Sequence, residues 1–127
     1  MDRAAVAAWL DRYVAAWKSY DPQAIGDLFS EDATYGYHPW DDPVKGREAI
    51  VADWLKSPDA PETWQADYAP FAVDGDKVVV TGWTNYFSAE TLTLDRKYYN
   101  VWLLRFDENG RCREFVEVFM EAPVKEA

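Results

Sequence analysis

Four side chains of this sequence combine an acid–base or hydrogen-bonding group with an apolar setting: Tyr13, His38, Asp53 and Glu117. His38 is the only histidine, and histidine is the side chain whose ordinary pKa lies nearest neutrality. Glu117 alternates with Phe115 and Phe119, and a carboxyl among apolar neighbours tends to have a raised pKa. Tyr13 lies within an apolar helical stripe, so its hydroxyl needs a partner in the interior. His38 and Glu117 therefore predict proton transfer in a cavity, and Tyr13 is a candidate for a polar group in the same pocket.

Each of these residues also has a structural interpretation. His38 is then a strand-end histidine bonded to backbone, and Tyr13 a core tyrosine bonded to a neighbour. Glu117 would hold the sheet to a helix, with Tyr13, Asn100 or His38 as its donor, because an unpaired buried carboxylate is costly. Asp53 would lie on the surface of its helix. Both interpretations remain open from the residues alone.

The N-terminal third is predicted to be mostly helical. Apolar residues at three- and four-residue steps predict a helix over Arg3–Ser19. Asp21-Pro22 begins a second, short helix with Phe29 on its buried side. A strand is predicted over Ala33–His38, and Gly46 opens a third helix.

The rest of the chain changes to a strand-like period and is predicted to form two hairpins. Gly82 predicts a bulge or bend within the second of these strands. We expect a single domain over residues 1–122 and a C-terminal tail over 123–127. The predicted strands are Thr63–Val73, Lys77–Ser88, Leu92–Phe106 and Arg111–Met120.

Both faces of the last two predicted strands are largely apolar. One face can pack on the helices, but the chain has no helices left to cover the other face. We therefore expect a homodimer formed through the outer sheet face.

Composition limits the possible partners. The chain has 127 residues and a net charge of −10, which disfavours nucleic acid and anionic membranes. Cys112 is the only cysteine and no signal or membrane-spanning segment is visible, so a cytoplasmic location is expected. One histidine and one cysteine cannot form the usual metal set, and we expect neither a metal nor a cofactor.

The chain carries 7 Trp, 8 Tyr and 6 Phe, which suits a wall around a small apolar or aromatic molecule, and equally an interface or a plain core. Tyr35 and Tyr37 are expected on opposite faces of their strand, so only one should reach a cavity. The residues predicted to contact a substrate are Trp17, Tyr35, Trp54, Asn100, Trp102 and Phe119.

Five segments together resemble the nuclear transport factor 2-like superfamily, and more narrowly its SnoaL-like and ketosteroid isomerase-like branch. The resemblance implies an α+β fold: three N-terminal helices on a curved antiparallel sheet, a cone-shaped, cystatin-like roll with a pocket between the two. The segments are Tyr13-Val14-Ala15-Ala16-Trp17, Asp21-Pro22-Gln23-Ala24-Ile25, Leu28-Phe29-Ser30-Glu31-Asp32-Ala33-Thr34, Gly46-Arg47-Glu48-Ala49-Ile50 and Arg105-Phe106-Asp107-Glu108-Asn109-Gly110-Arg111.

The resemblance also implies roles. Tyr13 falls at the position of the tyrosine that stabilises the oxyanion in steroid isomerases. Their aspartate base precedes a proline, and here that position falls on His38 or Tyr37. Their protonated acid falls on Trp102, which cannot replace it as an acid. Two of the three parts therefore differ from those of a steroid isomerase.

Two functions follow as hypotheses. The first is a cofactor-free acid–base enzyme, an isomerase, cyclase or dehydratase, acting on a small apolar molecule. The second is a non-catalytic dimeric module that binds a small ligand or serves as a scaffold. The family that the chain resembles includes both kinds of protein.

Overall fold

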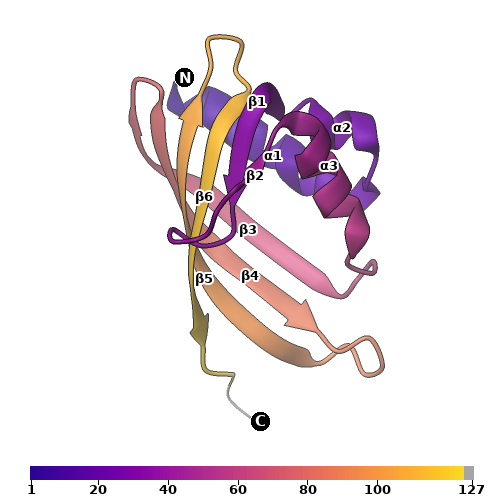
Figure 1. Cartoon of the computed structure of the whole chain (residues 1–127). Helices are drawn as coiled ribbons and strands as arrows, with labels where there is room; N and C mark the ends of the chain where they lie inside the picture. The colour runs from indigo at the N-terminus through magenta and orange to yellow at the C-terminus, as the bar shows by residue number, and fades with distance from the viewer. Residues whose placement is uncertain (125–127) are drawn as a thin grey trace.

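A computed structural model describes residues 1–124 of the chain (Figure 1). Three helices cover one end of a long, curved sheet, and the far ends of strands β3–β5 extend beyond them. Asp2 and Asp21 cap the first two helices by accepting hydrogen bonds from the backbone N–H groups of Ala5 and Ala24. The helices are α1 (Arg3–Ser19), α2 (Pro22–Gly26) and α3 (Arg47–Lys56).

The six strands form one sheet in the order β2-β1-β6-β5-β4-β3. All neighbouring strands pair antiparallel except β1 and β6, which pair parallel. The α+β architecture of helices on a mostly antiparallel sheet is therefore confirmed. The strands are β1 (Phe29–Gly36), β2 (Val44–Lys45), β3 (Trp64–Asp74), β4 (Lys77–Phe87), β5 (Leu94–Phe106) and β6 (Cys112–Ala122).

The region between α2 and α3 differs from the prediction. Helix α2 ends at Gly26, and Phe29 begins strand β1, where it pairs with Cys112 of β6. The strand ends at Gly36, before His38, and the short strand β2 was not predicted. Long-range pairing with β6 outweighs the local helical pattern here.

Gly82 was predicted to mark a bulge or a bend, and it causes no bulge. It pairs in regular register with Tyr68 of β3 and Asn100 of β5, and the irregularity in β3 lies between Pro70 and Ala72. A Cβ atom at Gly82 would overlap the backbone and ring of Tyr68. Glycine at this position therefore allows Tyr68 to fold across the sheet.

Aromatic residues close the core beneath the helices. The Trp9 ring lies edge-on to Phe29 and Phe106, with centroids 6.3 and 5.3 Å away. Its indole N–H donates to the Leu28 carbonyl over 3.0 Å, so the one polar atom of this buried ring is paired. The packing closes one end of the space between helices and sheet and leaves the other end open.

The predicted tail, residues 123–127, lies partly outside the described residues. Within the described part of the chain, none of the helices is long and apolar enough to span a membrane.

Candidate functional site

A cavity of about 560 Å³ lies between the helices and the concave face of the sheet. Its walls come from α1, β1, α3 and strands β3 to β6. Nine of the ten predicted site residues line it: Tyr13, Trp17, Tyr35, Asp53, Trp54, Asn100, Trp102, Glu117 and Phe119.

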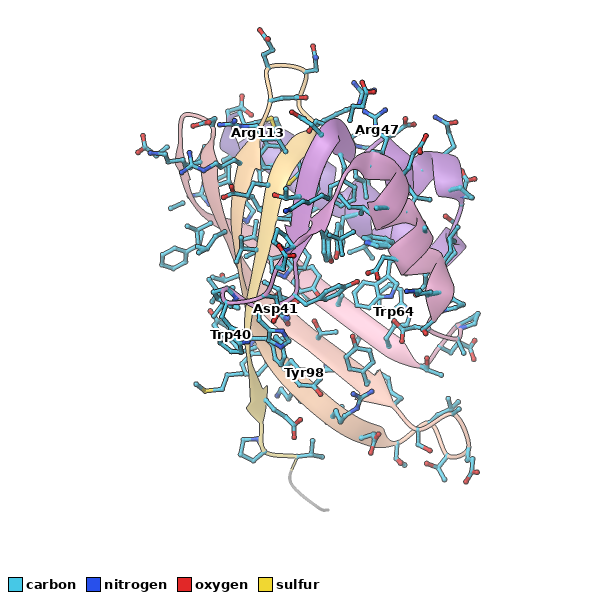
Figure 2. All side chains as sticks on the ribbon, in the orientation of Figure 1. Trp40, Asp41, Arg47, Trp64, Tyr98 and Arg113 are labelled. Carbon is cyan, nitrogen blue, oxygen red and sulfur yellow. The ribbon has the colours of Figure 1, made fainter. Side chains whose placement is uncertain are left out.

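His38 is the exception, because it does not line the cavity. Its Nδ1 lies 2.6 Å from Asp41 Oδ2, and its ring stacks on Trp40 with centroids 5.0 Å apart. The strand has already ended at Gly36, and the loop carries the imidazole outward. Figure 2 shows Trp40 and Asp41 in this loop, away from Trp64 and α3. We therefore leave His38 out of the site proposed below.

Tyr35 and Tyr37 both line the cavity, so the expectation that only one would reach it was wrong. Side chains two residues apart along a strand share a face, and these rings lie 5.1 Å apart. The Tyr37 hydroxyl donates to Asp53 Oδ2. This bond joins the residue just after β1 to α3 at the cavity wall. Burial, with the Asp53 carboxylate next, raises the pKa of Tyr37.

A row of hydrogen bonds crosses the sheet and ends on Glu117. Thr84 Oγ1 donates to Asn100 Oδ1 over 2.7 Å, and Asn100 Nδ2 donates to Glu117 Oε1 over 3.3 Å. Tyr68 and Thr84 also share a hydrogen bond, and since the Thr84 hydrogen is already used, the Tyr68 hydroxyl must be the donor. One residue from each of β3, β4, β5 and β6 thus forms a chain whose donors all point toward the carboxyl of Glu117.

Glu117 itself is largely buried on the concave face. Burial raises its pKa to about 7, while the hydrogen bond from Asn100 and the nearby indole N–H of Trp102 oppose the rise. Its second oxygen, Oε2, is buried without a hydrogen-bond partner among the described residues. Near neutral pH this carboxyl can therefore hold or release a proton.

Tyr13 and Tyr35 form a hydroxyl pair in the same cavity, with their oxygens 2.8 Å apart. Both rings stack nearly parallel to Phe115, at 5.8 and 4.2 Å. Two hydroxyls carry two hydrogens but share only one hydrogen bond, so one O–H hydrogen remains for another acceptor. Burial raises the pKa of each hydroxyl well above its usual value, which keeps both protonated as donors.

The Trp102 indole adds a further donor to this end of the cavity. Its Nε1 is buried, and it has no partner with hydrogen-bond geometry in the described part of the chain. The ring lies 4.7 Å from both Tyr13 and Phe115 and 4.3 Å from Tyr68. Trp102 therefore places an N–H group near the Glu117 carboxyl, although it cannot act as an acid.

Sequence reasoning missed several lining residues on the long strands. Thr84 and Tyr86 alternate along β4 in register with the concave face, and Arg96 and Tyr98 do so along β5. Extending the alternation from Asn100 along β5 reaches Tyr98 and Arg96, and the pairing of β4 with β5 sets Thr84 and Tyr86 beside them. Lys56 and Asp59 follow from no such period, because they lie where α3 gives way to a loop.

No group of three or more potential metal ligands occurs among residues 1–124. The carboxylates of the cavity instead accept hydrogen bonds from neutral donors. Asp59, for example, accepts from the Trp17 indole at 2.9 Å and from the Tyr20 hydroxyl at 3.4 Å.

Solved structures with the same architecture share little sequence with this chain. A nuclear transport factor 2-like protein of unknown function from Burkholderia xenovorans has a TM-score of 0.69 at 18% identity, covering 98% of this chain and 88% of its own. A protein of the same class with a cystatin-like fold, from Novosphingobium aromaticivorans, has 0.66 at 22%, covering 91% and 80%. A ketosteroid isomerase-like protein from Erwinia carotovora atroseptica has 0.61 at 18%, covering 95% and 97%. At these identities the likeness shows the fold alone.

No curated protein sequence matches the chain. The model of the SnoaL-like domain family matches residues 10–115, which is most of the chain. This match begins at Leu10 within α1, takes in α2 through β5 and reaches Phe115 on β6, two residues before Glu117. The chain belongs to the SnoaL-like domain family of the nuclear transport factor 2-like superfamily.

Proposed function

We propose that the cavity binds a small, largely apolar molecule and that Glu117 transfers a proton to or from it without a cofactor. One observation carries this proposal. Asn100 holds one oxygen of Glu117, while the other oxygen is buried in a cavity with aromatic walls and has no partner among the described residues. The burial that raises the pKa of this carboxyl to about 7 suits it to general acid–base work at neutral pH.

The proposed chemistry starts from a ligand with a carbonyl group. Glu117 removes a proton from the carbon beside the carbonyl, and the electrons of that C–H bond form a new C=C bond. The carbonyl electrons move onto oxygen, where the spare hydroxyl hydrogen of the Tyr13–Tyr35 pair stabilises the negative charge. The protonated Glu117 then returns the proton at a second position. Isomerisation, cyclisation and dehydration share the first of these steps.

The test is a turnover screen with ketones, enones and epoxides, followed by one substitution. Glu117→Gln keeps the shape of the side chain but cannot accept the proton, so turnover should fall at least a hundredfold with little change in binding. Glu114→Gln is the matched control, because Glu114 lies on the same strand and pairs with Arg105 instead of lining the cavity. If Glu117→Gln kept full turnover of an identified substrate, this assignment would be wrong.

The alternative is a non-catalytic module that binds a small ligand. The unpaired Trp102 N–H favours it, because a tryptophan donor can orient a ligand but cannot exchange a proton at neutral pH. A ligand that binds to wild type and to Glu117→Gln with similar affinity, and that neither protein converts, would support the alternative. Calorimetry together with product analysis on the same samples separates the two functions.

We also propose a homodimer formed through the outer face of the sheet. Three residue triplets lie side by side there on β4, β5 and β6, and eight of their nine residues are apolar: Val79–Leu103–Val116, Thr81–Val101–Val118 and Trp83–Tyr99–Met120. The exposed fractions of Met120 and Leu103 are 76% and 44% in the single chain. Such a continuous apolar surface is typical of a protein interface.

Sedimentation tests the dimer. Wild type should sediment as a dimer at micromolar concentration, and Leu103→Lys should sediment as a folded monomer, because a charge at a half-exposed position is tolerated only without a partner. A monomeric wild type would contradict the proposal.

A cytoplasmic location remains part of the proposal. It rests on the single cysteine, Cys112, which is buried and has no second cysteine to pair with.

A further inference from the structure

Two cationic side chains lie at the mouth of the cavity, on opposite walls. Arg96 lies near the start of β5 on the sheet side, and Lys56 is the last residue of α3 on the helix side. We propose that the cavity takes an elongated, largely apolar molecule that carries a carboxylate, and that Arg96 binds this carboxylate at the mouth. The inference rests on the proposed function, because it names the class of ligand for the same cavity.

The guanidinium of Arg96 is held by two tyrosine rings of the cavity wall. Its Cζ lies 4.7 Å from the centre of the Tyr86 ring and 5.9 Å from that of Tyr98. Its Nη1 donates to the Tyr98 hydroxyl over 3.3 Å. Figure 2 shows Tyr98 on β5, below α3, where the cavity opens. A stacked guanidinium has already lost much of its rotational freedom, so less entropy is lost when it binds an anion.

Arg96 also keeps donors available for a ligand. Its single ion pair in the described part of the chain joins Nε to Asp95 over 3.8 Å, and both side chains are more than half exposed. An exposed pair of this kind contributes little, and it leaves Nη2 without an acceptor among residues 1–124. A bound carboxylate can therefore reach the guanidinium without displacing a strong partner.

Among residues 1–124, no acidic side chain that lines the cavity forms an ion pair with Arg96 or Lys56. Asp53 accepts a hydrogen bond from Tyr37, and Asp59 accepts from Trp17 and Tyr20. Glu117 lies deeper, beside Trp102 in the strand register. The overall charge of −10 repels an anion at long range, so selection of a carboxylate must come from local contact with Arg96.

The spacing along β5 sets the length of the ligand. Arg96, Asn100 and Trp102 alternate onto the concave face, so the wall changes from charged at the mouth to apolar at depth. Arg96 and Asn100 are four positions apart, which is about 13 Å along an extended strand. A ligand whose carboxylate meets Arg96 therefore places its far end near Glu117, the partner of Asn100.

The experiment compares a carboxylate with its neutral isostere. Calorimetry would measure the binding of naphthylbutyrate and of its primary amide, naphthylbutyramide, to wild type, Arg96→Gln, Arg96→Lys and Arg105→Gln. Wild type should bind the acid about tenfold more tightly than the amide, as expected for one charge-assisted contact. Arg105→Gln is the matched control, because Arg105 lies on β5 with similar exposure but does not line the cavity.

Arg96→Gln should remove the preference for the acid and leave the affinity for the amide within about twofold. Arg96→Lys keeps the charge and should keep part of the preference, while Arg105→Gln should keep all of it. Equal binding of acid and amide by wild type, or a preference that survives in Arg96→Gln, would overturn this inference alone. If neither probe bound at millimolar concentration, the proposed function would fail together with it.

Discussion

Replacing Glu117 with glutamine should change how the stability of the protein depends on pH. Burial raises the pKa of Glu117 from 4.5 to about 7 in the folded chain. Between these two values the folded protein holds a proton that the unfolded chain has released. The contribution of Glu117 to the free energy of unfolding is therefore greatest below the lower pKa and is lost as pH rises through the upper one.

The size of the effect follows from the two pKa values. They differ by about 2.5, and one pKa unit corresponds to about 1.4 kcal/mol, so the whole effect is about 3 kcal/mol. Between about pH 5 and pH 8, the contribution of Glu117 to the free energy of unfolding should fall by about 2.5 kcal/mol. A glutamine does not titrate, so Glu117→Gln should gain this amount relative to wild type over the same interval.

Urea denaturation at several pH values between about 5 and 8 measures the effect. The difference in free energy of unfolding between Glu117→Gln and wild type removes the contributions of all other titrating groups. Glu114→Gln controls for the loss of one carboxylate from strand β6, since Glu114 is half-exposed and paired with Arg105. Parallel pH profiles for Glu117→Gln and wild type would refute the reasoning that burial holds a proton on Glu117.

Three further predictions follow from single contacts. Asn100→Leu removes the donor to Glu117 and should raise the pKa of that carboxyl by about one to two units, measured by carbon-13 NMR; an unchanged value would mean that the row of hydrogen bonds does not tune it. Gly82→Ala would push a methyl group into strand β3 and should destabilise the fold by about 3 kcal/mol or more in urea denaturation, whereas Gly36→Ala, whose nearest neighbour lies 3.5 Å away, should cost less than about 1 kcal/mol. Equal effects of the two would refute the packing argument. Burial raises the pKa of the Cys112 thiol, so a thiol reagent should label the native protein far more slowly than the urea-unfolded protein; fast native labelling would contradict this.

Most residues of the site could be predicted from the sequence, because side chains alternate between the two faces of a strand. Glu117 between Phe115 and Phe119, and Asn100 before Trp102, fix which side chains share the concave face once β5 and β6 are recognised as strands. The walls of the cavity could be predicted because the period of a strand is strict. Tyr35 and Tyr37 were assigned to opposite faces only because this rule was misapplied to the strand predicted over Ala33–His38.

Features that depend on contacts between distant segments were not predictable in the same way. The parallel pairing of β1 with β6 draws Phe29 out of the preceding helical pattern into a strand. This pairing and the strand both end at Gly36, and His38 lies in the loop beyond, where its ring contacts Asp41. The chemistry of His38 made it a candidate, but the position of its side chain depends on how far β1 pairs with β6.

The row of hydrogen bonds ending on Glu117 likewise needed four strands to be in register. Tyr68, Thr84 and Asn100 lie on three different strands, and no local pattern joins them. Asn100 was one of three donors considered for Glu117, and the sheet register selects it.

Titration of the Glu117 carboxyl in the wild-type protein tests the central claim most directly. Carbon-13 NMR of glutamate-labelled protein, with the signal assigned by its absence in Glu117→Gln, would follow this one group across the pH range. Our account predicts an apparent pKa of about 7, with the carboxyl half protonated near neutrality. A value at or below 4.5 would mean that water reaches the carboxylate freely. Glu117 would then be an ordinary ionised side chain, and the proposal of proton transfer in this cavity would be contradicted.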